Sequence, residues 1–536
     1  MQFCGGDGAH FRWKSKFLES DTITGLMTRS FFLTRPARIL ALVFLFGVAL
    51  AIRLYDLTDL PLDFHPTRQL VSIIKARGIY YETHPAGVEV WQVKSGIRQA
   101  QLKADVEPVV FERLAAFTYG FTGEKIWVAR IYSSLFWLAG GVFLFLLARG
   151  LVSFDGALAA TAYYLFFPYA VFASRSFQPD PLMVMLTLAF WWIFFHWTDL
   201  TPAASPARRG ESWIRALLAG LVGGFAIYVK FSAAFFVIGG ALGLALTRLP
   251  WRDLLRNAQV WAMAVLGILP AAAYLVYGIF FAGYLGGQFS GRFIPSLLLN
   301  PLNYLAWESK ASHAAGGVFI ALGLLGFVLV KESRLRSFLT GVWVAYLVYS
   351  LFFNYHVATH DYYHLPLIPI VAVSLGPLGE RFLARLAESA SGRWMRSAVV
   401  AILLYALFAV MWDIRNEMKA VDYRPQAAMW AEIGERLDHK RNVAALTQDY
   451  GSRLGYWGLT IAENWYTSGD QYYADLRGSK VLFDQAFDDM MKRRDYFLVT
   501  DFDELRLQPE LKTRLARYQI FAEGEGYVIY NLRELK

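Results

Sequence analysis

About eleven long apolar runs constrain this chain more than any other feature of its sequence. They lie at 37–55, 124–148, 154–173, 180–197, 213–229, 231–247, 258–281, 315–330, 337–354, 364–380 and 397–415. A helix of about 20 mostly apolar residues spans the hydrocarbon core of a bilayer. Only 18% of the 536 residues are charged, which is uncommon for a soluble chain of this length. The sequence therefore predicts an α-helical polytopic membrane protein with about eleven transmembrane helices.

Basic residues cluster before the first run and then in alternate loops, near 208–209, 248–256, 331–336 and 381–396. Loops rich in Lys and Arg stay in the cytoplasm, so the N-terminus is predicted to be cytoplasmic. An odd number of spans then places the C-terminal part outside. We expect an integral protein of a bacterial inner (plasma) membrane. The net charge of +9 comes from the membrane half, because acidic residues outnumber basic ones from residue 417 onward. Nucleic acid is therefore not an expected partner.

Three parts follow from this pattern. Residues 1–36 form a cytoplasmic tail, 37–416 a membrane domain with outer loops at 56–123 and 282–314, and 417–536 a soluble outer domain. In the first loop, 68–81 and 108–119 are predicted to be amphipathic helices lying in the membrane interface. The outer domain is predicted to be α/β, with strands at 442–447, 496–500 and 527–531 and helices at 426–437 and 509–518. It carries no catalytic motif, which favours a lid or docking module. The single cysteine, Cys4, lies in the tail, so neither a disulfide framework nor a cysteine-based metal site is expected.

Two short outer loops, 60–69 and 174–181, hold the most informative side chains. Asp63 and His65 follow the first span, and Asp180 stands between two prolines where a later span begins. Each aspartate has an ordinary explanation, since Asp180 could cap a helix and Asp63 could form a turn. Carboxylates at the ends of membrane helices are costly to keep, however, and two such loops on one face suggest acid–base chemistry at the membrane surface. We therefore treat Asp63, His65 and Asp180 as candidate bases.

Cationic and aromatic groups on the same face could stabilise an anion. Lys230 lies at an outer turn, where it could simply extend toward the interface, but this position runs against the positive-inside trend and favours an anionic partner such as a lipid phosphate. The segment 356–364 contains three histidines with Tyr362 and Tyr363. An aromatic belt explains the tyrosines, whereas the histidines favour hydrogen bonding to phosphate or sugar over metal binding.

Several short motifs occur in a fixed order over residues 37–380. They are Ile52-Arg53-Leu54, Pro61-Leu62, Glu107-Pro108, the stretch Gly123 to Arg130, Ser174-Arg175 with Asp180-Pro181, Lys230, and Asp361 to Pro369. In this order the chain resembles the GT-C membrane glycosyltransferases of the dolichyl/polyprenyl-phosphate type, the family-39-like group that includes protein mannosyltransferases and aminoarabinose transferases.

This resemblance implies the GT-C fold and transfer of a sugar from a polyprenyl-phosphate donor to a protein, lipid or polysaccharide acceptor on the outer face. It implies a base in the first loop and a second carboxylate at Asp180. The relatives usually carry Asp-Glu where this chain has His65-Pro66, so either Asp63 or His65 is the base. Membrane lipids complete the expected partners. Relatives differ in metal dependence, so no cofactor is assigned and a divalent ion stays open. The expected substrate contacts are Arg68, Gln69, Glu107, Lys230, Arg292, His360, Tyr362, Tyr363 and His364.

Two other classes of protein are compatible with a polytopic chain. A secondary transporter or flippase of lipid-linked sugars is the main alternative, and a non-catalytic polymer-binding subunit is the other. Transporters often contain inverted repeats and place charges near the bilayer midplane. This sequence shows no such repeat, and its notable charges fall at span ends on one face, which favours the transferase.

Overall fold

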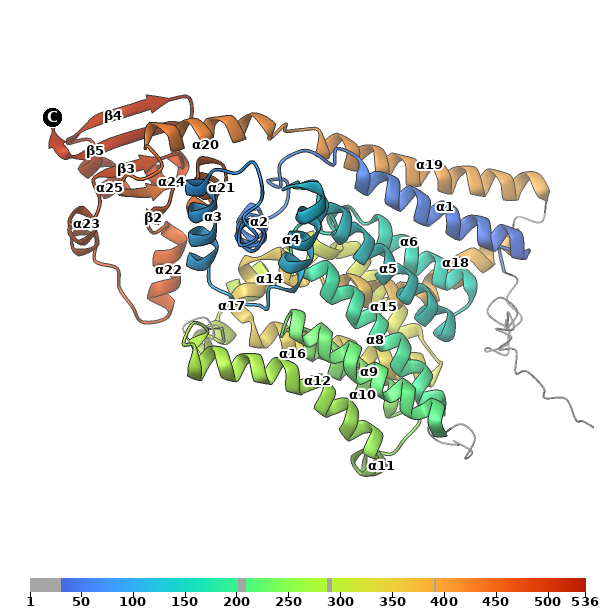
Figure 1. Cartoon of the computed structure of the whole chain (residues 1–536). Coiled ribbons are helices and arrows are strands. Elements are labelled where there is room, and N and C mark those ends of the chain that lie inside the picture. The colour runs from blue at the N-terminus through green and yellow to red at the C-terminus, as the bar shows by residue number, and fades with distance from the viewer. Residues whose placement is uncertain (1–29, 201–208, 287–291, 390–391) are drawn as a thin grey trace, which may run out of the picture.

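A computed structural model describes residues 30–200, 209–286, 292–389 and 392–536, so Cys4 and residues 1–29 of the predicted tail lie outside the described residues. Helices form a bundle, and a small α/β domain lies at one end of it (Figure 1). We call this the outer end, after the side of the membrane that the sequence predicts for it. Within the described ranges, eight helices are long and apolar enough to cross a membrane. They are α1 (Arg35–Leu54), α5 (Trp127–Leu151), α8 (Asp180–Leu200), α9 (Arg209–Val229), α12 (Ala258–Val276) continued by η4 (Tyr277–Phe281), α16 (Ser333–Phe352), α18 (Leu367–Ser389) and α19 (Arg393–Met418).

All eleven predicted runs lie in helical segments, which confirms the α-helical membrane fold, but three form helices too short to pass the length test. The run 154–173 divides into α6 (Phe154–Phe166) and α7 (Pro168–Ala173), because Pro168 disfavours helical geometry at Phe167. The run 231–247 forms only α10 (Ala233–Ala245). The run 315–330 forms α15 (Gly317–Leu329), which meets α14 (Pro301–Ala315) at an angle of 89°. Counting that bent pair gives nine spans, against about eleven predicted.

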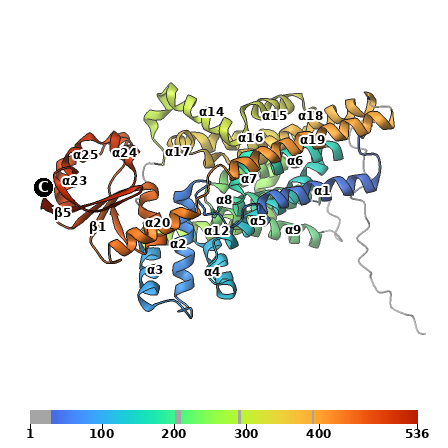
Figure 2. The same ribbon diagram turned by 90° about the horizontal axis from the view of Figure 1, so that it is seen from above.

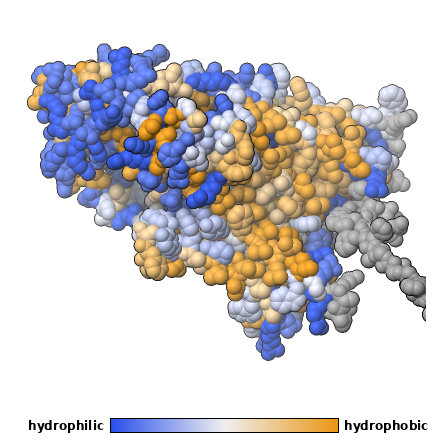
Figure 3. Space-filling view, viewed as in Figure 1, coloured by the Kyte–Doolittle hydropathy of each residue, from blue (hydrophilic) through white to orange (hydrophobic). Residues whose placement is uncertain are grey.

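The spans pack closely at some contacts and present apolar side chains outward at others. A Cβ built on Gly341 of α16 would lie 2.2 Å from the carbonyl oxygen of Gly239 in α10, so only glycine allows this approach. By contrast, Trp394, Tyr405 and Phe408 of α19 are exposed. On the face drawn in Figure 3, apolar surface covers most of the helix bundle, whereas polar surface covers most of the C-terminal domain. This division fits a membrane-embedded bundle with a domain outside the bilayer.

Three helices from the first loop lie beside the junction of the bundle and the C-terminal domain, and α3 and α4 project to one side of it (Figures 1 and 2). They are α2 (Pro66–Tyr81), α3 (Val90–Leu102) and α4 (Val110–Thr122), of which the sequence predicted α2 and α4 and missed α3. The prediction that both lie in the membrane interface does not describe α2. Leu70, Ile73 and Ile74 are buried against Phe111 of α4 and Tyr456 of the C-terminal domain, so α2 is a core helix.

The C-terminal domain is the predicted α/β unit. Its five-stranded sheet has the order β2-β1-β3-β5-β4, with β1 parallel to β2 and β3, and β5 antiparallel to β3 and β4. The three predicted strands and two predicted helices are confirmed, although the second helix ends before Tyr518, where β4 begins. Strands β2 and β4 were not predicted. Its elements are α20 (Arg424–Arg436), β1 (Val443–Leu446), η7 (Gln448–Gly451), α21 (Ser452–Gly458), β2 (Ala462–Asn464), α22 (Ser468–Leu476), α23 (Phe483–Met491), β3 (Tyr496–Val499), α24 (Phe502–Leu507), α25 (Pro509–Leu515), β4 (Tyr518–Gly524) and β5 (Tyr527–Leu535).

Buried polar contacts fix the domain on the first-loop helices. Arg77 of α2 forms an ion pair of 2.8 Å with Glu124 and donates a hydrogen bond of 2.5 Å to the carbonyl oxygen of Tyr456 in α21. The Tyr456 hydroxyl donates back to Glu124 at 2.5 Å. Because charged partners buried together are costly to separate, these contacts fix the position of α2 relative to the sheet.

Four remaining elements complete the chain. The short helix α11 (Trp251–Arg256) precedes α12, and η5 (Pro295–Leu299) precedes α14. Between α16 and α18 lie α17 (Asn354–Thr359) and η6 (Asp361–His364), which contain the predicted histidine and tyrosine segment.

Candidate functional site

The two informative loops meet at the outer end of the bundle, and Gln69 joins them. Its side-chain amide donates to the carbonyl oxygen of Phe64 at 2.6 Å and accepts from the backbone N–H of Phe177 at 3.0 Å. The side chain is fully buried. Gln69 was predicted to contact substrate, but both ends of its amide are occupied by backbone groups. Its observed contacts set the geometry of the loops.

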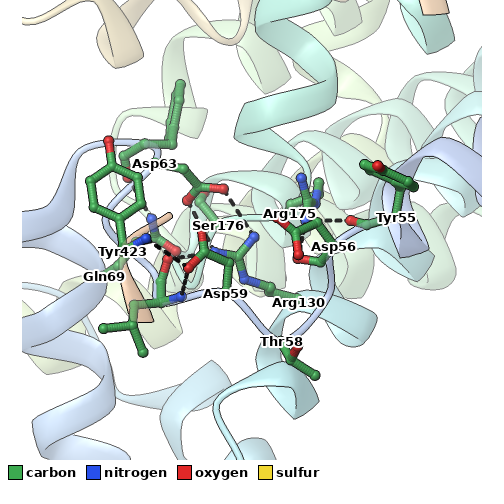
Figure 4. Close-up of polar contacts among 12 residues, drawn as sticks. Tyr55, Asp56, Thr58, Asp59, Asp63, Gln69, Arg130, Arg175, Ser176 and Tyr423 are labelled. Atoms are coloured by element: carbon green, nitrogen blue, oxygen red, sulfur yellow. Dashed lines mark hydrogen bonds and ion pairs between the residues drawn. The ribbon is translucent and has the colours of Figure 1, made fainter. Parts of the chain in front are cut away.

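The acidic groups of the two loops enter different networks. Both carboxylate oxygens of Asp63 accept hydrogen bonds from the guanidinium of Arg130, at 3.0 and 3.1 Å. Arg130 is 1% exposed and also donates to the carbonyl oxygen of Leu60. Figure 4 shows Asp63 together with Asp59 and Tyr423. The carboxylate of Asp59 accepts a hydrogen bond from the backbone N–H of Tyr423, which links the first loop to the C-terminal domain. No hydrogen bond joins Asp63 to Asp180 among the described residues. Asp63 thus holds the first loop against α5.

Asp180 forms a buried ion pair with Lys230. Asp180 begins α8 and Lys230 directly follows α9, and their Oδ1 and Nζ atoms lie 2.7 Å apart. The two side chains are 1% and 8% exposed. The second oxygen of Asp180, Oδ2, is buried without a hydrogen-bond partner among the described residues. A buried carboxylate oxygen is normally satisfied, so this oxygen is suited to accept a hydrogen bond from a ligand.

More cations surround this pair. Arg68 pairs with Glu107 at 2.8 Å, and Arg292 donates to the hydroxyl of Tyr363 at 3.2 Å. Lys230 Nζ lies 5.4 and 5.5 Å from the ring centroids of Tyr362 and Tyr363, within cation–π range. Burial raises the pKa of Glu107, but Arg68 and Lys230 outweigh it and lower the pKa to about 2.

We call Arg68, Glu107, Asp180, Lys230 and Arg292 the cationic cluster. The depressed pKa of Glu107 keeps that carboxylate charged at neutral pH. Even with both carboxylates charged, the three cations outnumber them. The cluster therefore carries a net positive charge, which suits an anionic ligand.

His65 lies in a second group of contacts, together with Asp361. Its Nε2 is 2.5 Å from Oδ1 of Asp361, which also accepts a hydrogen bond of 2.9 Å from the hydroxyl of Tyr169. His313 of α14 donates to the other oxygen of Asp361 at 2.9 Å. Burial raises the pKa of Asp361, yet the hydrogen bonds from His65, Tyr169 and His313 hold it well below its usual range. Asp361 is therefore a stable anion placed to orient His65.

The backbone at His65 is left-handed, with φ 44° and ψ 65°. A non-glycine residue in this region costs about 1–3 kcal/mol and is usually held there by its surroundings. Here Pro66 begins α2, and the His65 ring packs edge-on against Phe64 and Tyr362 at centroid distances of 4.6 and 4.8 Å. Such held strain is typical of functional sites. The left-handed backbone directs the imidazole toward Asp361 and Tyr362. The Tyr362 ring also contacts Lys230 of the cationic cluster.

The remaining predicted histidines divide between the site and the core. His364 is fully buried; its Nε2 donates to the carbonyl oxygen of Val357 at 2.8 Å and its Nδ1 accepts from the hydroxyl of Tyr346 at 2.8 Å. Both ring nitrogens are thus used inside the protein. His360 lies beside Tyr362 and Tyr363 and contacts Thr359. Within the described ranges, no three His, Cys, Asp or Glu side chains come together as metal ligands.

The depressed pKa values of two histidines predict a pH-dependent stability. Burial lowers the pKa of His360 and of His364 to about 4. In the unfolded chain each would titrate near 6.5, so the unfolded state binds more protons as the pH falls below that value. The stability from burying the neutral rings is therefore present above about pH 6.5 and is lost as the pH falls toward 4.

We expect the free energy of unfolding in detergent to fall by on the order of 1–2 kcal/mol per histidine between pH 7 and pH 5. Thermal unfolding at the two pH values measures this change. The His360→Gln variant should lose part of the pH dependence, and an unchanged slope in that variant would contradict the assignment.

Sequence reasoning did not identify three members of the His65 group. Asp361 was noted only as part of a motif, and Tyr169 and His313 were not considered. Nothing in the spacing of residues 65, 169, 313 and 361 indicates that they meet, because four separate segments bring them together. The one available signal was the density of ionisable and aromatic residues just before α18.

Comparison with known proteins agrees with this architecture. Residues 106–277 match the family described as dolichyl-phosphate-mannose-protein mannosyltransferase. No curated protein matches the chain in sequence. Among solved structures, ArnT from Cupriavidus metallidurans in the apo state is 16% identical with a TM-score of 0.57, over 92% of this chain and 98% of that one. The same protein bound to undecaprenyl phosphate gives a TM-score of 0.54 over the same shares of the two chains.

A second solved structure is more distant. The archaeal oligosaccharyltransferase AglB from Archaeoglobus fulgidus, in complex with an inhibitory peptide and a dolichol-phosphate, is 10% identical with a TM-score of 0.52. The alignment covers 91% of this chain and 73% of AglB. At these identities the likeness concerns the fold, which extends from the membrane helices into the C-terminal domain.

Proposed function

Because the chain has the GT-C fold and a segment that matches a mannosyltransferase family, we propose that it is a membrane glycosyltransferase. It moves a sugar from a polyprenyl-phosphate donor to a hydroxyl-bearing acceptor at the outer end of the bundle. The cationic cluster is the observation that carries this proposal. The proposal includes that the reaction and the C-terminal domain lie on the outer side of a bacterial plasma membrane, and the positive-inside pattern of the basic loops supports this orientation.

The cationic cluster is suited to the phosphate of such a donor. Undecaprenyl phosphate and a dolichol-phosphate are bound in the two relatives named above. In this chain the donor phosphate would lie among Arg68, Lys230 and Arg292. When the sugar–phosphate bond breaks, negative charge grows on the phosphate, and cations already fixed in place stabilise it without reorganising. Tyr362 and Tyr363 hold Lys230 at their ring faces.

His65 is best placed to act as the base. Asp361 accepts the Nε2–H of His65, which leaves Nδ1 to take a proton. The acceptor oxygen attacks C1 of the donor sugar, its proton passes to His65, and the bonding electron pair leaves with the phosphate. Asp180 serves as the second carboxylate, holding Lys230 through Oδ1 and accepting a substrate hydroxyl at Oδ2. In this scheme Asp63 has a positioning role, because Arg130 occupies both of its oxygens.

A direct assay tests the proposal. Purified protein in proteoliposomes is given a panel of radiolabelled undecaprenyl-phosphate sugars together with cell-envelope extract. We expect release of undecaprenyl phosphate and transfer of label to an acceptor in the extract. A transporter or flippase would move the donor and leave its sugar–phosphate bond intact, which would refute the proposal.

Replacing Arg292 with alanine should weaken donor binding. A hydrogen bond to a charged group contributes about 1.5–3 kcal/mol, so we expect the KM for the donor to rise about tenfold to a hundredfold. Arg113→Ala is the matched control, because Arg113 is an exposed arginine on α4 in the first outer loop. Initial rates over a range of donor concentrations measure the effect. Equal KM values for the two variants would remove Arg292 from the proposed phosphate site.

A further inference from the structure

Four tyrosines gather where the C-terminal domain meets α17. The rings of Tyr355 in α17 and Tyr473 in α22 lie 4.6 Å apart at 32°. Tyr472 of α22 is 54% exposed, and Tyr450 of η7 is 43% exposed. The Tyr450 hydroxyl donates to Asp470 of α22 at 3.1 Å, which joins η7 to the helix that carries Tyr472 and Tyr473. Large aromatic side chains left exposed together usually mark a binding surface.

The backbone that presents Tyr450 is strained. Asp449 and Tyr450 are consecutive non-glycine residues with φ of 57° and 51°. Left-handed geometry at two neighbouring residues is costly, so surrounding contacts must hold it. The Tyr450 hydroxyl donates to Asp470 at 3.1 Å, and Asp449 forms an ion pair of 2.5 Å with Arg453. The strained backbone lowers the stability of the fold and yet keeps an aromatic ring exposed at this point, which is typical of a ligand site.

This aromatic group adjoins the proposed reaction site. Asp449 accepts a hydrogen bond of 2.7 Å from the hydroxyl of Thr67, which stands between the base His65 and the phosphate ligand Arg68. On the other side, the Tyr473 ring lies 6.5 Å from His356, which itself lies 5.2 Å from Tyr363 of the site. The tyrosines therefore continue outward from the place where the sugar would be transferred.

We propose that Tyr355, Tyr450, Tyr472, Tyr473 and Asp470 form a subsite that binds a pyranose ring of the acceptor, beyond the hydroxyl that receives the sugar. This proposal rests on the proposed function and narrows it to a glycan or glycolipid acceptor. A pyranose presents an apolar C–H face that stacks on aromatic rings, and its hydroxyls bond to phenols and carboxylates. Aromatic walls with a few fixed polar groups are the usual composition of such sites.

A membrane anchor is the other use of exposed tyrosines, and the surroundings disfavour it. The Tyr450 hydroxyl donates a hydrogen bond to the carboxylate of Asp470, and Asp475 is exposed on the same helix as Tyr472. Arg477 lies 5.4 Å from the Tyr473 ring centroid, but the two carboxylates outnumber this one cation and would repel anionic lipid headgroups. The tyrosines other than Tyr355 also belong to the C-terminal domain, which is mostly polar on the face drawn in Figure 3.

Glycan binding by the purified full chain tests the subsite. The protein in detergent is applied to an array of immobilised pyranosides, and its affinity for the best-bound pyranoside is then measured in solution. We expect Tyr450→Ala and Tyr472→Ala each to lower that affinity at least tenfold, whereas Tyr472→Phe should keep most of it. The matched control is Phe502→Ala in α24, a half-exposed aromatic residue of the same domain, and it should bind as the wild type does.

Two results would overturn the subsite. One is the absence of pyranoside binding by the wild type, and the other is unchanged binding by both alanine variants. Release of undecaprenyl phosphate from the donor is measured in the same preparations. If the wild type and the variants all cleave the donor while no variant alters glycan binding, the proposed function stands and the subsite fails.

A spin label separates glycan binding from membrane anchoring. A nitroxide is attached at Tyr472→Cys in a Cys4→Ser background, and the protein is reconstituted in phosphatidylethanolamine/phosphatidylglycerol liposomes. We expect relaxation of the label by a water-soluble nickel complex and protection from the nickel complex by the bound pyranoside. Relaxation by oxygen instead, as at a lipid-buried position, would assign the tyrosines to the membrane surface and overturn the proposal.

Discussion

Asp180→Asn is expected to remove sugar transfer while leaving the fold in place. Asparagine keeps the shape of the side chain but loses the negative charge that pairs with Lys230 at 2.7 Å and the anionic Oδ2 atom. Lys230 would then be a buried cation without its partner, free to shift away from the phosphate position. We expect transfer to slow by about 10²–10⁴-fold, the range for loss of a positioned catalytic group. Release of undecaprenyl phosphate measures the rate, and thermal unfolding checks the fold.

Two further variants separate catalysis from stability. Asp199→Asn changes a carboxylate at the other end of the same helix, where Asp199 pairs with Arg334, and should keep wild-type transfer. Breaking a buried ion pair from one side costs stability, and removing both charges restores part of it. The double variant Asp180→Asn with Lys230→Gln should therefore be more stable than Asp180→Asn yet equally inactive. Near wild-type turnover in a folded Asp180→Asn protein would remove Asp180 from the mechanism.

The sequence was most informative where structure depends on local pattern. A run of about 20 apolar residues or a short alternating segment determines a span or a strand almost by itself, so the spans, β1, β3 and β5 were predicted. The short helices α10 and α15 also begin and end near their predicted runs. What failed there was the assumption that every apolar run forms one continuous span. Pro168 within the third run was a visible signal of a break that length alone concealed.

The candidate site depended on contacts that no local pattern records. Positive-inside topology placed the loops at 60–69 and 174–181 on one face, and Gln69 indeed connects them. Topology could not decide which partner each carboxylate takes. Asp63 pairs with Arg130, 67 positions away, and His65 pairs with Asp361 of η6, which is distant in the sequence. Choosing between Asp63 and His65 therefore required the packing of α5, α7, α14 and η6 around the first loop.

The question of whether Asp63 or His65 is the base leads to the second prediction with a large expected change in transfer rate. His65→Ala is expected to slow transfer by about 10²–10⁴-fold, because the acceptor hydroxyl loses its proton acceptor. Asp361→Asn should have a smaller effect, since the imidazole remains but loses the anion that orients it at 2.5 Å. The double variant should be no slower than His65→Ala alone, because the two side chains act as one unit. Initial rates at saturating donor concentration measure all three variants.

Two controls address the alternatives that the first loop allows. His84→Ala removes an exposed histidine that also has a left-handed backbone, with φ 51°, so it reports on the loss of a strained histidine away from the site. It should keep wild-type transfer. Asp63→Asn leaves the buried Arg130 without its charge partner, so we expect it to cost about 3–5 kcal/mol of stability. In the folded fraction, the transfer rate should fall by no more than about tenfold, which is less than the loss expected when a general base is removed. If Asp63→Asn instead lost as much rate as His65→Ala at unchanged stability, Asp63 would be the base, and the contact between His65 and Asp361 would be structural.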